Sequence, residues 1–455
     1  MSKRFQSGVL RRISDRARAD EGFSIVEVLV ATVIFMLLSV GIAQATVTSI
    51  RLSGDQKHRV TALSLAAGEI DKVRALLDPF KVLPDTSYAT IDGIKYTIDR
   101  QAEWVSGTGT DIPCGGAGTA NLQVKRVNVS VTWAGQLTTV STVTSDTVLA
   151  PVGRINDPTQ GTIMIAATRT GGPGAAGVTV TVSPVSGGAT ALTVAPPVTD
   201  SDGCSYALRV TPGIYSVSLS KSGYVDINQN TTPTLSVTVV AGATSSAPFA
   251  YDLAANYQMT YAPGKPAGTK FATNAETSFV NNNGTSVVGG GTPLSVPLYP
   301  WGVGYVPIAG HYIAPTQLSV GCRSVDPSEW QASASPLLAA GDHGGAVSTD
   351  PGGTVAMTVP MGLLKVKSSK AGTFKAVSAT PIAGWGDPGC GTAMSYTFAN
   401  IVANTDTNIA LPFGTWTISV TPSSGTATLT LTPLNNVVSG RVSGNTVMLD
   451  PRAAG

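Results

Sequence analysis

A long uncharged segment near the N-terminus constrains this chain most strongly. From Val28 to Ile50 no residue is charged, which is long enough for a helix to cross a bilayer. One carboxylate, Glu27, stands at the start of this segment. An acidic side chain within a membrane helix costs about 2.5–3.5 kcal/mol on insertion scales, so Glu27 should have a partner. Cleavage after Gly22 would provide one, because the new α-amine of Phe23 would lie one helical turn from Glu27.

The helical pattern continues beyond the uncharged segment. Apolar residues recur at helical spacing at Val60, Leu63, Ala67, Ile70, Val73 and Leu77, and charged and polar residues stand between them. Pro79 should end the helix, since it cannot donate to the helical ladder. The pattern predicts one helix over residues 23–78, roughly 84 Å long at 1.5 Å per residue. Residues 23–50 would span the membrane, and the apolar stripe of residues 51–78 would cover a β-sheet.

Charge predicts the orientation of this helix. Residues 1–22 carry six basic side chains against three acidic ones, and basic residues beside a span stay cytoplasmic. The chain after about residue 50 should therefore lie outside the inner membrane. Without residues 1–22 the basic count falls from 29 to 23 and the acidic count from 27 to 24. A nearly neutral protein gives no support to nucleic-acid binding through a broad basic field, so no nucleic-acid partner is expected.

The run Gly22-Phe23-Ser24-Ile25-Val26-Glu27 resembles the N-terminus of type IV prepilins and the related pseudopilins. In that family a basic leader ends in Gly and is followed by an aromatic residue, a Glu at the fifth mature position and an apolar helix. The resemblance covers about the first 78 residues. It implies that a prepilin peptidase cuts between Gly22 and Phe23 and N-methylates Phe23. It also implies that Glu27 meets the Phe23 amine of a neighbouring subunit during filament assembly.

Three other interpretations of the N-terminus compete with this one. An ordinary secretory signal could be cut at Ala43-Gln44-Ala45, but it explains neither Glu27 nor the charged leader. A twin-arginine signal at Arg11-Arg12 would require apolar residues directly after the pair, and these are polar. A plain single-span anchor needs no Gly-Phe junction. We favour the prepilin interpretation, then the anchor.

The rest of the chain predicts an α+β protein in which the long helix is followed by a small antiparallel sheet and two or three all-β sandwiches. Only 12% of the 455 residues are charged, and 50 glycines and 29 prolines supply frequent turns. Alternation places Val127, Val129, Val131 and Trp133 on one face of a half-buried strand. Tyr96–Trp104 and Leu137–Val148 should be its partners. We assign residues 79–150 to this pilin-type sheet domain, laid on the helix.

Several β modules should follow a linker at residues 150–158. Residues 160–252 resemble the carboxypeptidase regulatory-like, or transthyretin-like, β-sandwich through three runs, Gly177–Val182, Thr199–Gly203 and Pro212–Leu219. The family name implies no peptidase activity, since such modules are mostly spacers and binding platforms. The run Leu411–Val420 echoes Pro212–Leu219, which predicts a second such sandwich over residues 355–435. Residues 253–354 should form a β-rich domain of uncertain fold, and residues 436–455 a C-terminal tail.

Four cysteines, Cys114, Cys204, Cys322 and Cys390, suit an exported protein with disulfides. None forms a Cys-x-x-Cys pair, so neither a zinc site nor a redox motif is indicated. Three pairings are possible. We favour Cys322 with Cys390, which would tie the two C-terminal domains together, and Cys114 with Cys204 follows by elimination.

Little in the sequence points to catalysis. The three histidines, His58, His311 and His343, have no neighbouring group at a spacing that implies a nucleophile pair or a metal chelate, so we expect neither an enzyme nor a cofactor. The run Asp200-Ser201-Asp202-Gly203 could suggest a calcium loop, but a hairpin turn explains it better. Aromatic residues could form an adhesive patch, although packing in a core explains them better: Tyr299, Trp301, Tyr305 and Tyr312.

These observations predict a minor pilin, matured by prepilin peptidase, whose β-rich head serves adhesion, priming of assembly at the tip or partner binding. Its partners would be other pilins through the helix, the inner membrane before assembly and a surface ligand bound by the head. The protein would be a single-pass inner-membrane protein and would reach the cell surface after assembly. The alternatives are a minor pseudopilin of a secretion system and a signal-anchored surface protein that joins no filament.

Overall fold

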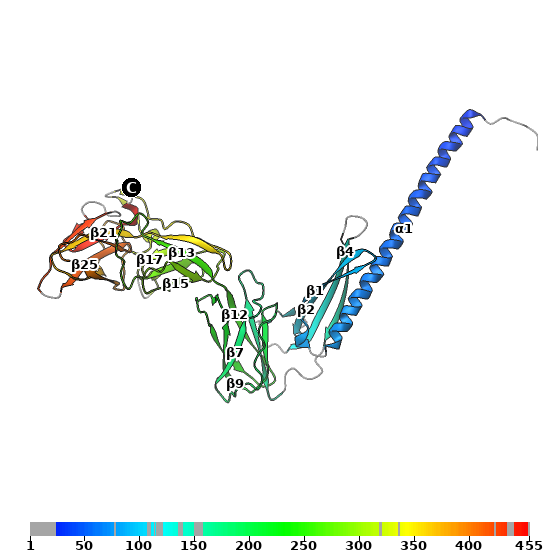
Figure 1. The fold of residues 1–455 in the computed structure, drawn as a ribbon, viewed down its shortest axis with the longest axis horizontal. Helices are drawn as coiled ribbons and strands as arrows, with labels where there is room; N and C mark the ends of the chain where they lie inside the picture. The colour runs from blue at the N-terminus through cyan, green and yellow to red at the C-terminus, as the bar shows by residue number, and fades with distance from the viewer. Residues whose placement is uncertain are drawn as a thin grey trace, which may run out of the picture. The chain divides into compact units, whose positions relative to one another are not determined.

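A computed structural model describes residues 24–76, 79–106, 111–112, 114, 122–134, 140–149, 158–317, 321–334, 337–422, 425–434 and 441–453. It confirms the predicted α+β class: one long N-terminal helix precedes a succession of largely antiparallel sheets (Figure 1). The chain divides into two compact units. One comprises residues 1–102 and 125–150, and the other comprises residues 103–124 and 151–455.

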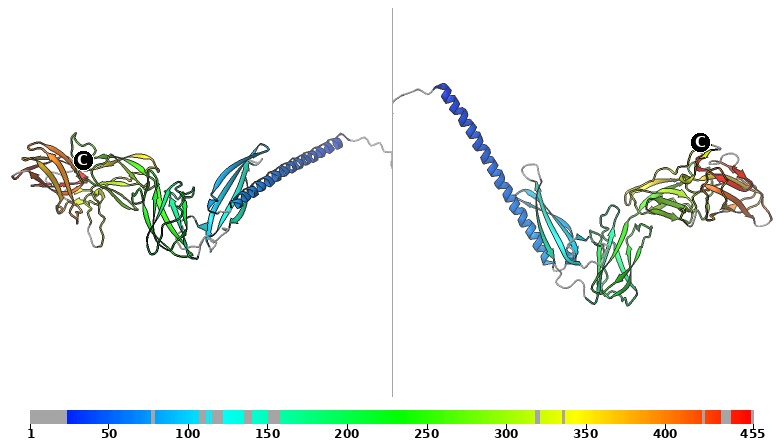
Figure 2. Two further views of the ribbon diagram at one scale, coloured as in Figure 1. Left: turned by 60° about the horizontal axis from the view of Figure 1, so that its bottom comes forward. Right: turned by 180° about the vertical axis from the view of Figure 1, so that it is seen from behind.

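Helix α1 runs over Ile25–Ala75 without interruption, so its 51 residues extend about 77 Å. Ser24 caps its first turn, and Leu76 is its last capping residue. A short 3-10 helix, η1, follows at Pro79–Lys81, as expected where a proline cannot continue the ladder. The predicted bounds at residues 23 and 78 lie outside the described residues. Figures 1 and 2 show that the sheet of the first unit covers only the C-terminal part of α1.

The sheet of the first unit has the strand order β1-β2-β4-β5, and β3 pairs with the end of β2. Val127, Val129 and Val131 are fully buried against the helix and Trp133 nearly so, which confirms the predicted alternation. The bounds are β1 Asp85–Ile91, β2 Ile94–Ser106, β3 Asp111–Ile112, β4 Leu122–Ala134 and β5 Val140–Leu149.

The buried stripe of α1 differs from the predicted one. Ala62 and Ala66 are fully buried with Ile70 and Val73, whereas the predicted Val60 and Leu63 are 64% and 47% exposed. The predicted Ala67 is also exposed. Ala62 and Ala66 allow the sheet to lie close to the helix axis, and the predicted Ile70 and Val73 complete the buried face. The prediction was therefore right at Ile70 and Val73 and wrong at Val60, Leu63 and Ala67, because it followed apolar spacing and did not place Ala62 and Ala66 under the sheet.

The first sandwich comprises a four-stranded sheet, β10-β12-β6-β8, and a three-stranded sheet, β11-β9-β7. Its core includes Ile163, Ile165, Tyr215, Val217 and Tyr251. Strand β12 runs parallel to β6, and the other strand pairs are antiparallel. The bounds are β6 Gly161–Thr168, β7 Thr179–Ser186, β8 Cys204–Val210, β9 Gly213–Ser220, β10 Tyr224–Asp226, β11 Thr234–Val239 and β12 Thr244–Leu253.

The middle module consists of two three-stranded sheets, β16-β13-β20 and β15-β14-β17, with a small β18–β19 pair. Residues 256–261 of β13 pair in parallel with residues 354–359 of β20, so this module extends beyond residue 354, where we placed its boundary. The bounds are β13 Ala255–Tyr261, β14 Thr277–Asn281, β15 Gly284–Val288, β16 Ser295–Leu298, β17 Val306–Ala309, η2 Pro327–Glu329, β18 Ser333–Ala334, β19 Leu337–Leu338 and β20 Thr354–Val359.

The last sandwich packs the sheet β24-β21-β26 against the sheet β23-β22-β25-β28-β27. Strand β28 pairs with β25, so residues 441–449 belong to this sandwich and not to a separate tail. The bounds are β21 Gly362–Ser368, β22 Gly372–Ser378, β23 Ser395–Ile401, β24 Thr407–Leu411, β25 Gly414–Pro422, β26 Leu429–Pro433, β27 Val442–Ser443, β28 Thr446–Leu449 and η3 Pro451–Ala453.

Candidate functional site

The N-terminal end of α1 is the candidate assembly site. Ser24 has a non-helical backbone conformation, with φ −59° and ψ 137°. Its side-chain oxygen accepts a hydrogen bond from the Val26 backbone N–H at 3.4 Å. The backbone N–H groups of Glu27 and Val28 donate to the Ser24 carbonyl at 2.9 and 3.2 Å. The first turn is thus closed by Ser24, and Glu27 stands three residues after this cap, where a carboxylate favours the positive end of the helix dipole.

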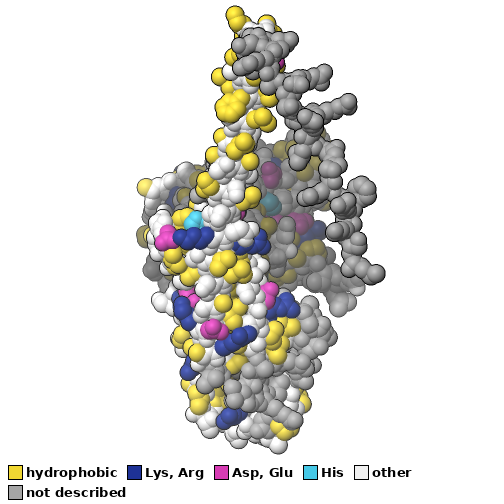
Figure 3. Space-filling view, turned by 90° about the vertical axis from the view of Figure 1, so that its right-hand side faces the viewer, with side chains coloured by type: hydrophobic (Ala, Val, Ile, Leu, Met, Phe, Trp, Pro, Cys, Tyr) yellow, Lys and Arg dark blue, Asp and Glu magenta, His cyan; other side chains and the backbone are white. Residues whose placement is uncertain are grey.

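The Glu27 carboxylate lies exposed on an otherwise apolar surface. Within the described residues, no side-chain hydrogen bond or ion pair of Glu27 is formed. Ile25 is 83% exposed and Phe35 is 71% exposed on the same helix. On the face in Figure 3, hydrophobic side chains dominate the upper part of α1, and charged ones gather along its lower part. By length and composition α1 could cross a membrane. Gly22 and Phe23, the predicted cleavage and methylation residues, lie outside the described residues.

The four cysteines form two disulfides, Cys114 with Cys204 and Cys322 with Cys390. Cys114 lies between β3 and β4, and Cys204 is the first residue of β8. Cys322 follows β17 and Cys390 precedes β23, so this bond joins the middle module to the last sandwich. These are the two pairs that we favoured from the sequence.

The three histidines lie apart and each has a local contact. His58 Nδ1 is 2.9 Å from the Tyr96 hydroxyl, and His311 Nδ1 is 3.2 Å from a Glu276 carboxylate oxygen. His343 Nδ1 is 2.7 Å from the Gly344 carbonyl. In the described part of the chain, no group of three or more His, Cys, Asp or Glu residues is placed to hold a metal ion.

The run at Asp200 forms a turn. The Asp200 carboxylate accepts hydrogen bonds from the backbone N–H groups of Asp202 and Cys204 at 3.0 and 2.8 Å. Gly203 occupies the left-handed region with a φ of 76°, which suits a glycine in a tight turn. One carboxylate oxygen of Asp200 is therefore committed to the backbone, and the hairpin interpretation explains the run.

The central aromatic residues belong to the core of the middle module. Tyr299 and Tyr305 are buried, and the ring of Tyr305 packs edge-on against that of Tyr257. Burial raises the pKa of Tyr257 to about 12. Trp301 and Tyr312 are half-buried. Core packing therefore explains Tyr299 and Tyr305 better than an adhesive patch does.

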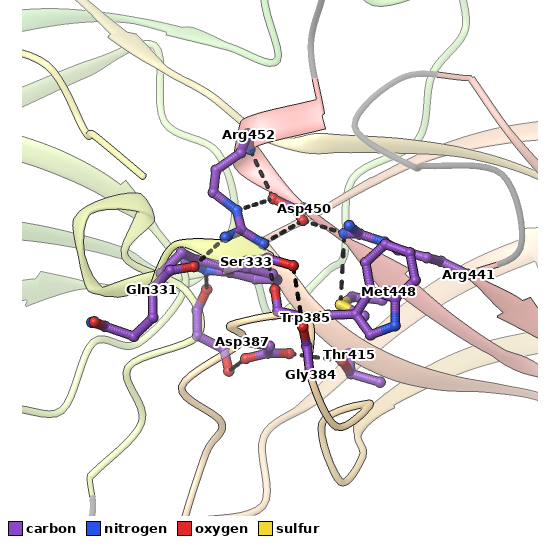
Figure 4. A network of polar contacts seen from close by, with 12 residues as sticks. Gln331, Ser333, Gly384, Trp385, Asp387, Thr415, Arg441, Met448, Asp450 and Arg452 are labelled. Carbon is purple, nitrogen blue, oxygen red and sulfur yellow. Dashed lines mark hydrogen bonds and ion pairs between the residues drawn. The ribbon is translucent and has the colours of Figure 1, made fainter. Parts of the chain in front are cut away.

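A second polar centre, which sequence reasoning missed, lies near the C-terminus (Figure 4). Asp450 and Arg441 are fully buried and form an ion pair, and Arg452 donates from Nε and Nη2 to the two Asp450 oxygens at 2.9 Å each. The Arg452 guanidinium also donates to the carbonyls of Gln331 and Trp385. The Arg441 guanidinium lies 3.7 Å from the centre of the Trp385 ring.

This cluster is held ionised by its own hydrogen bonds. Burial alone would raise the pKa of the Asp450 carboxyl, but hydrogen bonds from Arg452 and Arg441 outweigh it and keep that pKa below its usual range. Because Arg452 contacts Gln331 in the middle module and Trp385 in the last sandwich, the cluster fastens the end of the chain to both. The sequence signal was weak, since Arg441, Asp450 and Arg452 stand in a segment predicted to be a tail.

No family model matches this chain, and the comparison with curated proteins found no match. Among solved structures it is similar to the Bacillus anthracis TIE protein, with 11% sequence identity and a TM-score of 0.17 over 82% of this chain and 72% of that one. A streptococcal ancillary pilin aligns with 10% identity and a TM-score of 0.17 over 51% and 75% of the two chains. The major pilin subunit of Bacillus cereus aligns with 11% identity and a TM-score of 0.18 over 60% and 95%.

Proposed function

We propose that this chain is a minor pilin of a type IV filament, matured by cleavage between Gly22 and Phe23 and assembled through α1. The observation that carries the proposal is Glu27, the one charged residue between Ile25 and Ile50. It stands exposed at the start of a helix that is apolar enough to lie in lipid. A carboxylate in that position is costly unless it meets a cation, and the freed Phe23 amine is the cation nearest to it along the chain.

The outer face of α1 supports assembly by helix packing. Val60 and Leu63 are largely exposed, while the opposite face is buried against the sheet. Burying such side chains contributes about 1.5–3 kcal/mol each, which favours contact between the helices of neighbouring subunits. The β-rich head would then serve adhesion, tip priming or binding of a partner.

Mass spectrometry of the mature N-terminus tests this proposal. Protein purified from its native membrane should begin at Phe23 and carry a methyl group on the α-amine. A Gly22→Ala variant, which alters the residue before the bond, should retain the leader and serves as the matched control. A native N-terminus at Met1, or one after Ala45, would contradict the proposal and favour the anchor or the secretory signal.

A pseudopilin of a secretion system would share this processing. The two machineries differ in what fails when the gene is deleted. Loss of surface filaments or of filament-dependent adhesion supports the pilin, and loss of protein secretion with normal filaments favours the pseudopilin.

A further inference from the structure

Each disulfide joins two segments that lie far apart along the chain. The bond between Cys114 and Cys204 ties the β3–β4 connection to the first sandwich. The bond between Cys322 and Cys390 ties the middle module to the last sandwich. The sequence separations are 90 and 68 residues, so the two bonds enclose several strands and the chain between the modules.

No disulfide connects the first sandwich to the middle module. Instead, Gln229 of the first sandwich forms hydrogen bonds with residues of the middle module. Its Oε1 accepts from the Tyr299 backbone N–H at 2.6 Å, and its Nε2 lies 3.2 Å from both the Tyr305 hydroxyl and the Ser286 hydroxyl. Gln229 has a φ of 66°, a left-handed conformation that few non-glycine residues adopt. Backbone N–H groups on either side donate to Asp226, which fixes this loop.

Apolar packing and the C-terminal cluster add to these joints. Val225 and Ala254 pack with Tyr299 between the first sandwich and the middle module. Arg452 connects the end of the chain to Gln331 and Trp385, close to the segments that the Cys322–Cys390 bond joins. Every joint from residue 158 onward is therefore fastened by more than the polypeptide link.

We propose that the head carries tension as a cross-braced body, with the two disulfides routing force around the segments that they enclose. A pull applied at α1 would pass along β1 and β2 to Cys114, then through the disulfide to Cys204 and β8. Strands β4 to β7 and the linker would carry no force. The second disulfide would relieve β18 to β22 in the same way. The proposal rests on the proposed function only in that a filament anchored at one end would supply the tension.

The enclosed segments define a measurable length. An extended chain spans about 3.3–3.6 Å per residue, so the bonds withhold about 300–320 Å and about 220–240 Å of extension. Reduction by dithiothreitol, which is oxidised as each disulfide becomes two thiols, should release both lengths.

Single-molecule force spectroscopy on the full chain in detergent, held by tags at its two ends, tests the proposal. The oxidised protein should unfold with a total extension shorter by both withheld lengths than the same protein treated with dithiothreitol after folding. A Cys114→Ser/Cys204→Ser variant should recover only the longer length, and a Cys322→Ser/Cys390→Ser variant only the shorter one. In the first variant the new extension should appear as the earliest event at the lowest force, because the linker and β4–β5 then carry the load.

Two results would overturn the proposal. One is an equal total extension before and after reduction. The other is release of the recovered length in the first variant only together with or after the strongest unfolding event, which would mean that the enclosed strands bear force well without the bond. Should a variant fail to fold, the total extension of the wild type before and after reduction still decides the first point, and the force at which the additional length appears in the reduced wild type decides the second. These measurements need no filament, so they stand apart from the test of Phe23 processing.

Discussion

The Glu69 carboxylate on α1 accepts a hydrogen bond from the Arg100 guanidinium on β2, with 2.5 Å between Oε1 and Nη1. Both side chains are largely buried, and Arg100 Nε also donates to the Leu83 carbonyl at 2.8 Å. A second cation, Lys72, lies 3.0 Å from the other Glu69 oxygen. This pair fixes which face of the helix meets the sheet, because a rotation of α1 would leave Arg100 buried without its partner.

Overpacking the alanine face should loosen the first unit. Ala66 is fully buried between α1 and the sheet, so Ala66→Leu should cost about 1–3 kcal/mol of stability. Hydrogen exchange of β2 and β4 peptides in the full chain measures this loss. The matched control is Leu63→Ala on the exposed face, which should change the stability derived from hydrogen exchange by less than about 0.5 kcal/mol. Equal effects of the two variants would contradict the observed orientation of the helix.

Removal of the Glu27 charge should separate processing from assembly. In Glu27→Ala the leader should still be removed, while incorporation into filaments falls, since the Phe23 amine loses its counter-charge. Immunoblots of sheared filaments and of membranes measure the two steps. Thr32→Ala, an exposed change on the same helix, should leave both steps intact. Normal incorporation of Glu27→Ala would count against the proposed pairing.

Loss of the buried carboxylate near the C-terminus should strongly destabilise the last sandwich. In Asp450→Asn, Arg441 stays buried without an anionic partner, which costs about 3–5 kcal/mol. Urea unfolding followed by tryptophan fluorescence measures the change. Asp406→Asn removes an exposed carboxylate 3.5 Å from Lys365 and should cost at most about 1 kcal/mol. If the two variants lose equal stability, the cluster does not hold the module.

Acid should weaken the same cluster. The pKa of the Asp450 carboxyl is lowered in the folded protein, whereas the pKa of an Asp carboxyl in an unfolded chain is about 3.9. The unfolded chain therefore takes up the proton first as pH falls, so the stabilisation is present above about pH 4 and is lost progressively as the pH falls towards the lowered pKa of the folded protein. The difference in unfolding midpoint between the wild type and Asp450→Asn, measured from pH 7 to pH 3, should narrow as the pH falls below about 4. A constant gap across this range would show that the ionised carboxylate is not the cause.

Local patterns in the sequence predicted much of the fold. Alternation located the buried face of β4, and helical periodicity with Pro79 located α1 to within a few residues. The strand predicted at Tyr96–Trp104 lies inside β2, and the one predicted at Leu137–Val148 overlaps β5. In each case the residues that determine the structure are neighbours in sequence.

Features that depend on distant residues were missed. The domain boundary predicted at residue 354 was wrong because β20 pairs with β13, about a hundred residues earlier. Parallel strands are not joined by a tight turn, so the sequence between them carries no turn signal for this pairing. The prediction of a C-terminal tail at residues 436–455 was wrong because β28 is too short to give a clear strand pattern. Its position is set by pairing with β25 and by the Arg441–Asp450 ion pair. At the N-terminus, Gly22 and Phe23 of the sequence motif lie outside the described residues. The pairing of Glu27 with the Phe23 amine is therefore a proposal that combines the sequence motif with the geometry of the helix.

The parallel β13–β20 pair also sets the order in which a newly made chain can fold. Met357 and Val359 of β20 and Ala410 of β24 lie in the core around β13. A chain that emerges with its N-terminus first can complete the first sandwich as soon as β12 has appeared. Residues 255–309 must then wait, with apolar strands uncovered, until residue 410 follows. The second half of the β-rich part should therefore fold in one late step, and this interval is when a chaperone would be most needed.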